Sequence, residues 1–225
     1  MIIRKYGIVL RRLKEGDIEL VRQMRNSIEI RQYMFYREEI TLEMQKKWFL
    51  SVNNVSNYYF IIEVNGKKIG LIHGKNNDFE KGTCEGGIFI WDRPYIGTTI
   101  PSLASIILND FTFYTVHSLN TVYAKVVQGN KTALKYNRFM GYETCPPLND
   151  DKDIQWMQLT AENYLKRIKT LRKGIASLTG DNTPLSLDEI DFSDDSAEDI
   201  KHLYGNLPKA LQGLKPRLLQ SGHQV

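Results

Sequence analysis

A carboxylate followed by two glycines, Glu85-Gly86-Gly87, stands inside a run of otherwise strand-forming residues. Two glycines weaken a strand, and they often mark a bulge or a place where a ligand approaches the backbone closely. Because a bulge can turn a side chain into a cleft, Glu85 is the best candidate in the chain for a general base. A surface or loop-pairing glutamate is the alternative interpretation of the same residue.

A second feature with chemical potential is the loop after this strand, which leads directly into a helix. It reads Asp-Arg-Pro-Tyr-Ile-Gly-Thr-Thr over residues 92–99. A glycine-bearing loop at a helix start offers free backbone N–H groups and the positive end of the helix dipole, which suit a phosphate or pyrophosphate. An ordinary strand-to-helix turn also contains a single glycine, and on spacing alone that interpretation has the advantage.

A third feature is the segment 130–142, which reads Asn-Lys-Thr-Ala-Leu-Lys-Tyr-Asn-Arg-Phe-Met-Gly-Tyr. Asn130 ends a strand and begins a helix, so its local role is an N-cap. Ala133 and Tyr136 share one helical face, where packing is their local role. Gly141 stands at the position where a left-handed residue closes a helix.

The elements that must position these residues follow from hydrophobic periodicity and helix-start signals. Helices are expected to begin at Asp17 and Thr41, with a short one over 27–35 between them, and a hairpin is expected to turn at Asn65-Gly66. Because strand and helix alternate in the second half, the pattern predicts a mixed α/β fold. The other expected elements are strands 8–13, 84–91, 121–128 and 153–159 and helices 100–115 and 131–140.

This order of strand, phosphate-type loop, long helix, strand, Asn-x-x-Ala helix and Gly-aromatic pair resembles the GNAT family of N-acetyltransferases. The resemblance covers about residues 8–160, and Asn130, Ala133 and Gly141-Tyr142 match the family's N-x-x-A…G-F segment with Tyr in place of Phe. It implies the GNAT-like acyl-CoA N-acyltransferase fold, of α/β class. In that fold a mixed, mostly antiparallel sheet has a bulged central strand and flanking helices, and acetyl-CoA is the co-substrate.

The resemblance implies that the pantetheine arm of acetyl-CoA lies along the strand at 88–90. It also implies that the diphosphate lies at the N–H groups of Gly97, Thr98 and Thr99. The family's loop usually reads Arg/Gln-x-x-Gly-x-Gly/Ala, whereas Pro94, Gly97 and Thr99 stand at the aligned positions here. The implied cofactor-binding residues are Ile88, Phe89, Ile90, Tyr95, Ile96, Gly97, Thr98, Thr99, Asn130 and Ala133.

The residues implied for the chemistry are Glu85 as the base and Tyr136 or Asn137 at the leaving thiolate. The family's helix tyrosine, which often protonates that thiolate, falls at Asn137 by spacing. Tyr136 stands one residue earlier, about 100° round the helix. Tyr136 would serve as the acid if the helix is rotated, whereas Asn137 would meet the thiolate as a hydrogen-bond donor.

Residues of the N-terminal helices narrow the range of possible acceptors. Arg25-Asn26, Arg31 and Lys47-Trp48 resemble a subset that acetylates amino sugars carried on nucleotides and, less closely, enzymes that acetylate ribosomal-protein N-termini. In both groups these helices border the acceptor site, which implies substrate-binding roles for Arg25, Asn26 and Arg31. Each arginine by itself is equally well explained as a solvated surface residue.

Length and composition limit the number of domains and the class of protein. The 225 residues, 42% hydrophobic and 25% charged, predict one globular domain over 1–160 and a helical and acidic C-terminal appendage of unknown role over 161–225. Within the appendage, Leu185, Leu187, Ile190 and Phe192 could dock on the domain. The net charge of +4 is too small for the basic surface of a nucleic-acid binder.

The cysteines, histidines and apolar runs argue against several classes of protein. Two distant cysteines do not make a disulfide framework, and no carboxylate–histidine cluster suggests a metal site. No apolar run approaches the roughly 18 residues that a membrane span needs. The reducing cytoplasm is therefore the default compartment, with no metal and no membrane partner expected.

The sequence therefore predicts an acetyl-CoA-dependent N-acetyltransferase acting on a small-molecule amine, in the first place an amino group of a nucleotide-linked sugar. Two other functions stay open. One is the acetylation of a protein N-terminus, and the other is a domain that has lost catalysis and binds CoA or a partner. A nucleic-acid partner is not expected, and a homodimer is compatible with the sequence.

Overall fold

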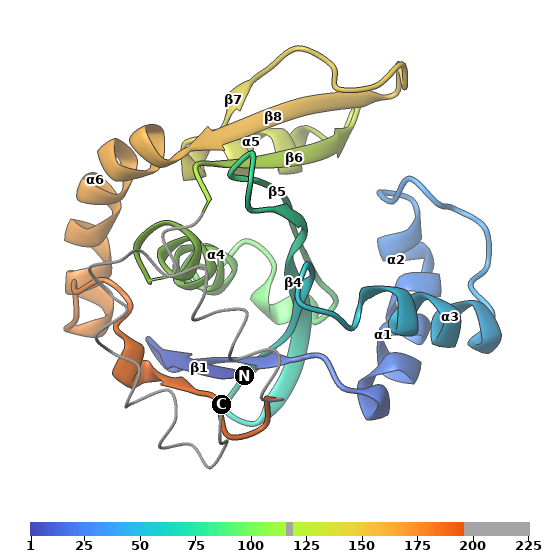
Figure 1. Cartoon of the computed structure of the whole chain (residues 1–225), viewed down its shortest axis with the longest axis horizontal. Coiled ribbons are helices and arrows are strands. Elements are labelled where there is room, and N and C mark those ends of the chain that lie inside the picture. Colours follow the sequence, from blue (N-terminus) through green and yellow to red (C-terminus); the bar gives the residue numbers. More distant parts are fainter. Residues whose placement is uncertain (116–118, 196–225) are drawn as a thin grey trace.

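Figure 1 shows the computed structural model of the chain, which describes residues 1–115 and 119–195. Within these ranges nine strands form one sheet in the order β7-β8-β6-β5-β4-β3-β2-β1-β9. Neighbouring strands are antiparallel except β5 and β6, which are parallel. The mixed, mostly antiparallel sheet with flanking helices confirms the predicted fold class. The strands are β1 (Ile2–Lys5), β2 (Ile8–Arg12), β3 (Tyr58–Val64), β4 (Lys67–Asp78), β5 (Thr83–Ile90), β6 (Thr121–Val127), β7 (Glu143–Thr144), β8 (Ile154–Thr160) and β9 (Ile190–Asp191).

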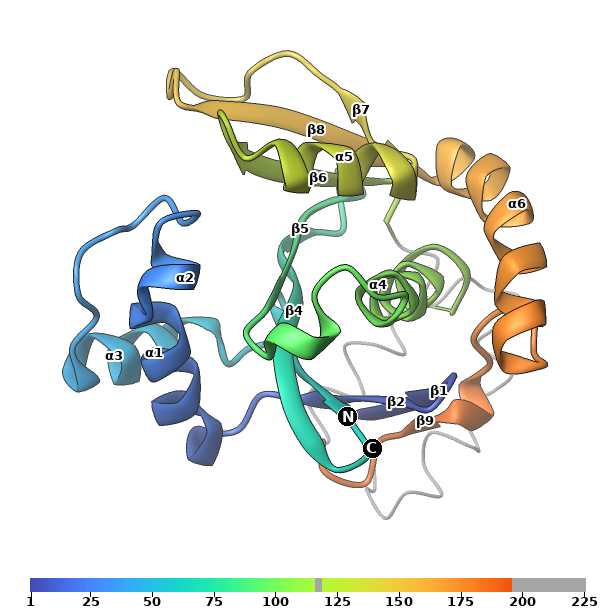
Figure 2. The same cartoon turned by 180° about the vertical axis from the view of Figure 1, so that it is seen from behind.

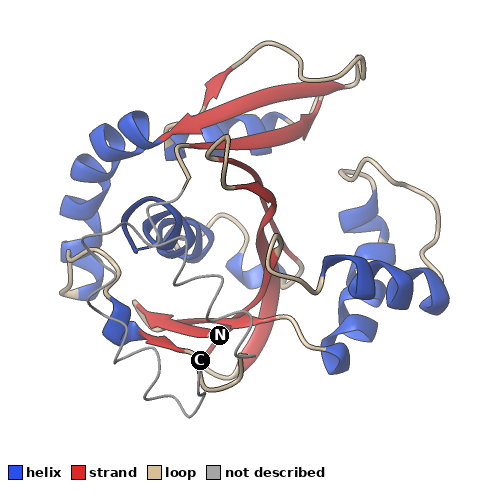
Figure 3. Ribbon diagram, in the orientation of Figure 1, coloured by secondary structure: helices blue, strands red, loops and turns tan. Residues whose placement is uncertain are grey.

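Helices cover both faces of this sheet. Figure 2 shows α4 and α5 on one face, and Figure 3 shows the N-terminal helices on the far side of the central strands. A π-helical segment, Phe111–Thr115, continues α4, so that the helix expected over 100–115 changes its winding near its end. No described helix is both long enough and apolar enough to cross a membrane. The helices are α1 (Ile18–Asn26), α2 (Ile28–Arg31), α3 (Leu42–Val52), α4 (Ile100–Asp110), α5 (Lys131–Met140) and α6 (Ala161–Thr179).

Local side-chain signals set the start of α3 and both ends of α5. Thr41 Oγ1 accepts a hydrogen bond from the Met44 N–H at 3.2 Å, which caps the start of α3. Asn130 Oδ1 accepts from the Ala133 N–H at 3.0 Å, so the N-cap role expected of Asn130 is confirmed. Gly141 closes α5 with φ of 100°, the left-handed conformation that favours glycine.

The parallel pair at the centre of the sheet is short. β5 and β6 pair only over Thr83–Glu85 and Thr121–Tyr123. Beyond this point β5 stays paired with β4 up to Ile90, whereas β6 stays paired with β8 up to Val127. The two strands therefore part, and Figure 1 shows β5 turning away from β6 toward the lower half of the sheet.

A register shift interrupts a central strand, but not where it was expected. The shift lies between Lys75 and Asp78 of β4, where Asn76 takes a left-handed φ of 53°. Gly86 and Gly87 of β5 keep regular pairing with β4. The sheet thus has the expected bulged central strand, while the prediction that placed the bulge at the two glycines is wrong. Their missing side chains make room for neighbouring side chains instead.

The C-terminal part shares both the core and the sheet with the rest. Tyr164 and Ile168 of α6 are buried in the main hydrophobic cluster, which also contains residues of the sheet and of α4. Of the residues expected to dock, Leu185, Ile190 and Phe192 are buried in the same cluster. β9 pairs with β1 at the edge of the sheet. The domain boundary at residue 160 stays a prediction, and residues 196–225 of the appendage lie outside the described residues.

Candidate active site

A cavity of ≈ 940 Å³ opens where β5 and β6 part. Residues of α1 and of the loop after α2 line one side of it, and residues of α4 and α5 line the other. Its size suits a cofactor-sized ligand. Glu85, Tyr136 and Asn137, the three residues predicted to be catalytic, all line it. The structure therefore brings together the parts of the site that the sequence kept far apart.

Strand alternation gathers charged and polar side chains on one face of the sheet beside the gap. Glu85 pairs with Lys75 of β4, and His73 stands two residues along the same strand, hence on the same face. Lys125 stands two residues beyond the β6 partner of Glu85. Tyr59, the β3 partner of His73, packs in the hydrophobic cluster formed with α1 and α3. We call the face that bears these five residues the α1 face.

Glu85 is held by two ammonium groups and one amide. Its Oε2 lies 3.0 Å from Lys125 Nζ and 3.4 Å from Lys75 Nζ. Asn76 Nδ2 donates a hydrogen bond to Oε1 at 3.2 Å. Burial alone would raise the pKa of Glu85, but these partners outweigh burial and hold that pKa below its ordinary value. Glu85 is therefore ionised at neutral pH, as a base must be, and it also forms the ion pairs that the alternative interpretation expected.

His73, to which the sequence assigned no role, lines the same cavity. Its ring stacks on Tyr59 with the centroids 4.8 Å apart. It also lies over Gly87, where an added Cβ would stand 2.5 Å from the ring Cε1. Burial, with a smaller contribution from the charge of Lys75, lowers the pKa of His73 to about 3, so the ring is neutral. The sequence signal for this ring was the pair Gly86-Gly87. The sequence predicts a bulge at this pair, whereas Gly87 leaves space for the His73 ring.

Of the three residues expected to bind the acceptor, only Arg25 reaches the cavity. Its guanidinium lies 5.9 Å from the centre of the Phe89 ring, and its Nε is buried without a hydrogen-bond partner among the described residues. Burial lowers the pKa of Arg25, although a guanidinium stays charged at neutral pH. Asn26 instead exchanges two hydrogen bonds of 2.9 Å with the backbone of Ile40. Arg31 is not among the residues that line the cavity.

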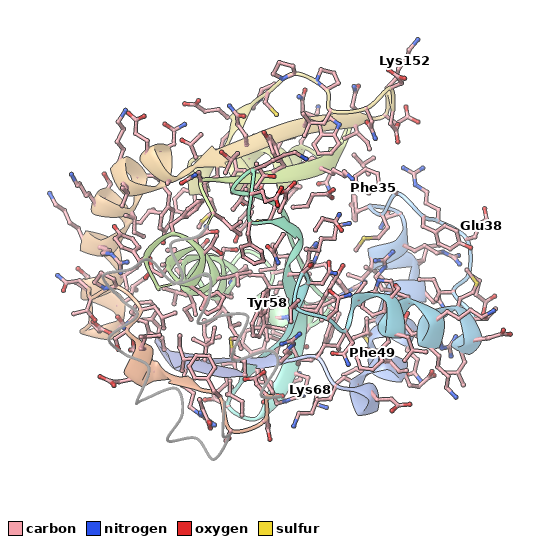
Figure 4. All side chains as sticks on the ribbon, viewed as in Figure 1. Phe35, Glu38, Phe49, Tyr58, Lys68 and Lys152 are labelled. Atoms are coloured by element: carbon pink, nitrogen blue, oxygen red, sulfur yellow. The ribbon has the colours of Figure 1, made fainter. Side chains whose placement is uncertain are left out.

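Aromatic side chains form a rim on the loop after α2. Tyr33, Phe35 and Tyr36 are exposed, and all three line the cavity. Figure 4 shows Phe35 on the part of this loop that faces β6 and β8. Trp48 of α3 also lines the cavity, but it packs edge-on against Tyr59 with the ring centroids 5.2 Å apart, against the hydrophobic cluster formed with α1. The exposed rings are free to stack on a flat ligand.

The first turn of α4 stands beside the cavity with backbone donors available. Gly97 has φ of 80°, and no atom lies within 4 Å of the place where its Cβ would stand. The Thr98 N–H donates to the Tyr95 carbonyl at 3.3 Å, whereas the N–H groups of Gly97 and Thr99 meet no acceptor in the described part of the chain. Open space, free donors and the positive end of the helix dipole fit a phosphate. Ile96 and Gly97 line the cavity, but Tyr95, Thr98 and Thr99 do not.

The other cofactor-binding residues predicted from the sequence line the cavity on both sides of the gap. Ile88, Phe89 and Ile90 lie on β5 beyond the point where it parts from β6, and Asn130 and Ala133 lie at the start of α5. The side chain of Asn130 is engaged as a helix cap, so it holds α5 in place. In the described ranges no cluster of three His, Cys, Asp or Glu side chains could hold a metal ion.

Tyr136 of α5 has its hydroxyl tied to α4. The hydroxyl donates to the Pro101 carbonyl at 2.9 Å and lies 2.7 Å from Ser105 Oγ. A phenol has only one proton, so Ser105 is the donor in the second contact. Burial raises the pKa of Tyr136 to about 12. Asn137 also lines the cavity, and its side chain makes no hydrogen bond to another described residue.

Comparisons with known proteins give a family match and a set of similar folds. The family described as acetyltransferase (GNAT) domain matches residues 8–143. The spermidine N-acetyltransferase from Vibrio cholerae in complex with CoA and spermine has a TM-score of 0.63 and 19% identity, covering 72% of this chain and 99% of that chain. A dodecameric structure of spermidine N-acetyltransferase from the same organism, in an intermediate state, has a TM-score of 0.56, 20% identity and the same coverage. No curated protein matches the chain. At this level of identity the structural likeness establishes the fold alone.

Proposed function

The chain belongs to the GNAT acetyltransferase family, and from that premise we propose that its acceptor is a primary amine on an anion-bearing molecule, in the first place a nucleotide-linked amino sugar. Membership makes the chain an acetyl-CoA-dependent N-acetyltransferase. When bound, acetyl-CoA supplies the acetyl group as a thioester. The family leaves open which amine receives that group, and the side chains of the α1 face bear on this question.

Charge on the acceptor side of the cavity is the observation that carries the proposal. Arg25, Lys75 and Lys125 line the cavity against two carboxylates, Glu29 and Glu85, so three positive charges face two negative ones. Lys75 and Lys125 share the single carboxylate of Glu85. The Nε of Arg25 has no described partner. A phosphate or carboxylate on the acceptor would supply the missing anion through charge-assisted hydrogen bonds.

The aromatic rim supports a ligand with a flat ring. Tyr33, Phe35 and Tyr36 are exposed although they are large and apolar, and all three stand on one loop at the cavity. Stacking of a base on an aromatic side chain contributes about 1–3 kcal/mol and needs no particular hydrogen-bond pattern. An anion and a flat ring on the same acceptor are the two parts of a nucleotide.

A polyamine is the second candidate, because spermidine N-acetyltransferases share the fold. Glu29 and Glu85 are the features of the cavity that favour a cationic acceptor. Both carboxylates already have cations, since Arg93 lies 3.0 Å from Glu29 and two lysines hold Glu85. A polyamine carries positive charge only and would lie beside Arg25 without a counter-charge, which costs affinity. We therefore rank the polyamine below the anion-bearing amine.

Each part of the acetyl transfer is assigned to particular residues of the chain. The free N–H groups of Gly97 and Thr99 would hold the diphosphate of acetyl-CoA, and the backbone of β5 at Ile88 and beyond would hold its acyl arm. A primary amine is partly protonated near neutral pH and must lose a proton to react, so Glu85 serves as the base, directly or through water. Asn137 donates a hydrogen bond to the departing sulfur, because the proton of the neighbouring Tyr136 is committed to Pro101.

The division of labour between Asn137 and Tyr136 is a first prediction. We expect Asn137→Ala to lower kcat by about tenfold with little change in Tm, because it removes a donor that makes no hydrogen bond to another described residue. Tyr136→Phe loses two hydrogen bonds to α4, so it should lower Tm and leave kcat within a few-fold of wild type. Thiol release gives kcat and thermal unfolding gives Tm. If Tyr136→Phe lowers kcat more than Asn137→Ala does, Tyr136 is the acid that protonates the thiolate.

An acceptor panel tests the proposed function. Thiol release from acetyl-CoA would be measured with a UDP-linked amino sugar, the same sugar without the nucleotide, spermidine, and a peptide with a free N-terminus. We expect the highest kcat/KM with the nucleotide-linked amine. Arg25→Gln should raise its KM by about tenfold, while Arg31→Gln, outside the cavity lining, should leave KM unchanged.

Competition with UDP separates the candidate acceptors further. UDP alone should inhibit, and should inhibit less at high salt, because screening weakens contacts between exposed charges. If spermidine or the peptide has the highest kcat/KM and UDP has no effect, the anion-bearing acceptor is wrong and that acceptor class replaces it. The homodimer, like the cytoplasmic location, stays a prediction.

A further inference from the structure

The imidazole of His73 occupies the centre of the α1 face at the cavity. In the β4–β5 register His73 pairs with Gly87, and its ring lies directly over that glycine. An added Cβ at residue 87 would stand 2.5 Å from Cε1 and 2.8 Å from Nε2, both too close for real atoms. A glycine at this position therefore lets the ring approach the β5 backbone, one residue before the stretch 88–90 predicted to carry the acyl arm.

The ring is fixed in this place from its other side. Tyr59 stacks on it with an interplanar angle of 27°, and Trp48 holds Tyr59 by an edge contact. Side chains locked by packing of this kind can hold a reacting group within the narrow tolerance that chemistry requires. His73 thus has the rigidity of a site residue although it stands on a strand.

The polar atoms of the ring have no partner. Nδ1 is buried and unpaired among the described residues, and no described side chain or backbone group hydrogen-bonds either ring nitrogen of His73. A buried polar atom left in this state destabilises the fold. Such groups are rare in folded proteins. A ligand that hydrogen-bonds to this atom when it enters the cavity is one explanation.

The surroundings keep the ring neutral, and a neutral ring accepts hydrogen bonds. Burial is the main reason that a second proton on the ring is disfavoured; the charges of Lys75 and Arg25 add to this effect, and the charge of Glu85 opposes it. A neutral imidazole has one N–H and one bare nitrogen with a lone pair. The bare nitrogen can accept a hydrogen bond from an N–H group that enters the cavity.

We propose that His73 accepts a hydrogen bond from the acceptor amine and thereby aims the amine's lone pair at the acetyl group on β5. This inference rests on the proposed function of the same site, and it names the group that orients the nucleophile. A neutral primary amine has two N–H bonds and one lone pair in a roughly tetrahedral arrangement. When one N–H is directed to His73, the lone pair is directed away from the ring, and orientation of this kind accelerates a reaction strongly.

The proton balance of the step does not involve His73. The amine nitrogen forms a bond to the acetyl carbon while the carbon–sulfur bond breaks, and the sulfur leaves with the electron pair. The nitrogen then has one proton too many, which passes to water, because Glu85 already holds the proton that it took from the ammonium form. The departing thiolate is met by Asn137 and takes its proton from solvent. His73 holds the same N–H before and during the attack, so it is a positioning contact to substrate.

Three substitutions at residue 73 separate this role from packing. His73→Phe keeps a ring over Gly87 and against Tyr59 but removes both nitrogens. His73→Asn and His73→Gln lose the ring and restore a hydrogen-bond acceptor near the places of Nδ1 and Nε2. The matched control is Tyr58→Phe, which changes one hydroxyl on the neighbouring strand without touching the cavity lining. Tm and the Kd for acetyl-CoA would be measured for each variant.

The kinetic outcome decides the proposal. We expect His73→Phe to bind acetyl-CoA like wild type and to lose about 10²-fold in kcat, with a smaller change in the acceptor KM. One of the two amide variants should exceed His73→Phe by about tenfold, although it packs less well. A His73→Phe enzyme with wild-type kcat, or two amide variants no better than His73→Phe, would overturn the proposal.

The test stays informative whichever acceptor is correct, because every primary amine offers the same N–H. If spermidine proves to be the acceptor, the anion-bearing acceptor fails while the comparison at His73 still stands. A readout without turnover is the ¹⁵N shift of the His73 ring in the CoA-loaded protein, titrated with the UDP-linked amino sugar and, separately, with spermidine. A shift change with either amine supports the hydrogen bond, and no change with both refutes it.

Discussion

Glu85 is the side chain whose charge matters most on the α1 face. Lys125 and Lys75 hold its ionised form, so it loses its charge only at a more acidic pH than an ordinary glutamate. An anion held in this way is a weak base, yet it lies beside the place where an ammonium must become an amine.

The charge of Glu85 is tested by Glu85→Gln. We expect kcat to fall by about 10²-fold near neutral pH and to recover in part as pH rises, because the amine then loses its proton to solvent without help. Glu63→Gln is a matched control, since Glu63 pairs with Arg11 and does not line the cavity. A pH–rate profile of Glu85→Gln that matches wild type in height and shape would leave water as the only base.

Individual residues were predictable where a local pattern carries the signal. Asn130 as a cap and Gly141 as a left-handed residue follow from their own positions on a helix. His73 did not follow, because its partner Gly87 stands on another strand and only pairing brings the two together. Asn26 was misread for a similar reason: its neighbour in space is the backbone of Ile40, at the end of a loop.

Two elements, β5 and α4, shape the site: β5 opens the gap by parting from β6, and the start of α4 supplies the backbone donors for an anion. β5 leaves β6 after Glu85, and the turn at Gly97 then brings the chain to the first turn of α4. The gap opens toward the end of β5 that leads into α4. The backbone of β5 and the free N–H groups before α4 therefore lie along one cavity. Neither element makes this site without the other.

The loop at the start of α4 is tested by Gly97→Val. A Cβ at this position would stand in space that the free protein leaves open, and a phosphate on the helix start needs that space. We expect the Kd for acetyl-CoA to rise at least about tenfold by calorimetry. Gly7→Val is the control, because Gly7 has φ of 74°, equally open surroundings and a place in the distant β1–β2 turn. If both variants titrate acetyl-CoA like wild type, the loop assignment is wrong.

Asp17 ties the start of α1 to the sheet and so positions Arg25 at the far end of that helix. Arg11 donates two hydrogen bonds of 2.9 Å to its carboxylate, and Lys68 and the Lys14 N–H donate one each. Burial alone would raise the pKa of Asp17, but these donors outweigh it and lower that pKa to about 2. The folded state therefore favours the ionised carboxylate.

The sign of this pKa shift fixes a pH dependence. Since the folded-state pKa lies below the unfolded one, the stabilisation is complete above about pH 4 and disappears as pH falls toward 2. A shift of this size corresponds to about 2 kcal/mol. Asp17→Asn should lower the free energy of unfolding by that amount at pH 7 and by almost nothing at pH 2, measured with urea. Asp150→Asn, at an exposed position in the loop between β7 and β8, should change neither value.

The longer helices and strands were predictable because each has its own hydrophobic periodicity. The short strands were not predictable. β7 and β9 have two residues each, and β9 exists only because it pairs with β1, far away in the sequence. The bulge was placed in the wrong strand for the same reason. Gly86-Gly87 is visible in the sequence, but which of two paired strands carries an extra residue depends on their register.

The whole described chain is held together by polar contacts that cross the predicted boundary at residue 160. Asp110, at the end of α4, accepts hydrogen bonds from Arg172 and Tyr164 of α6 and from the Leu185 N–H. Lys5 of β1 lies 2.9 Å from Asp181 and 2.7 Å from Glu189. The C-terminal segment is thus joined to α4, and through α4 to the site, by groups that no sequence pattern connects.

A single and a double variant test whether the parts before and after residue 160 unfold as one unit. Arg172→Met removes the guanidinium that contacts both oxygens of the buried Asp110 carboxylate, which should cost about 3 kcal/mol in urea unfolding. Asp110→Asn added to Arg172→Met should restore part of that loss, because the second change removes the buried charge that the first left behind. Lys166→Met is the control, at an exposed pair on the same helix. If α6 were an independent appendage, Arg172→Met would leave the main unfolding transition in place and add a separate early one. We expect instead a single transition, shifted as a whole, because α6, α4 and the sheet bury their side chains in one hydrophobic cluster.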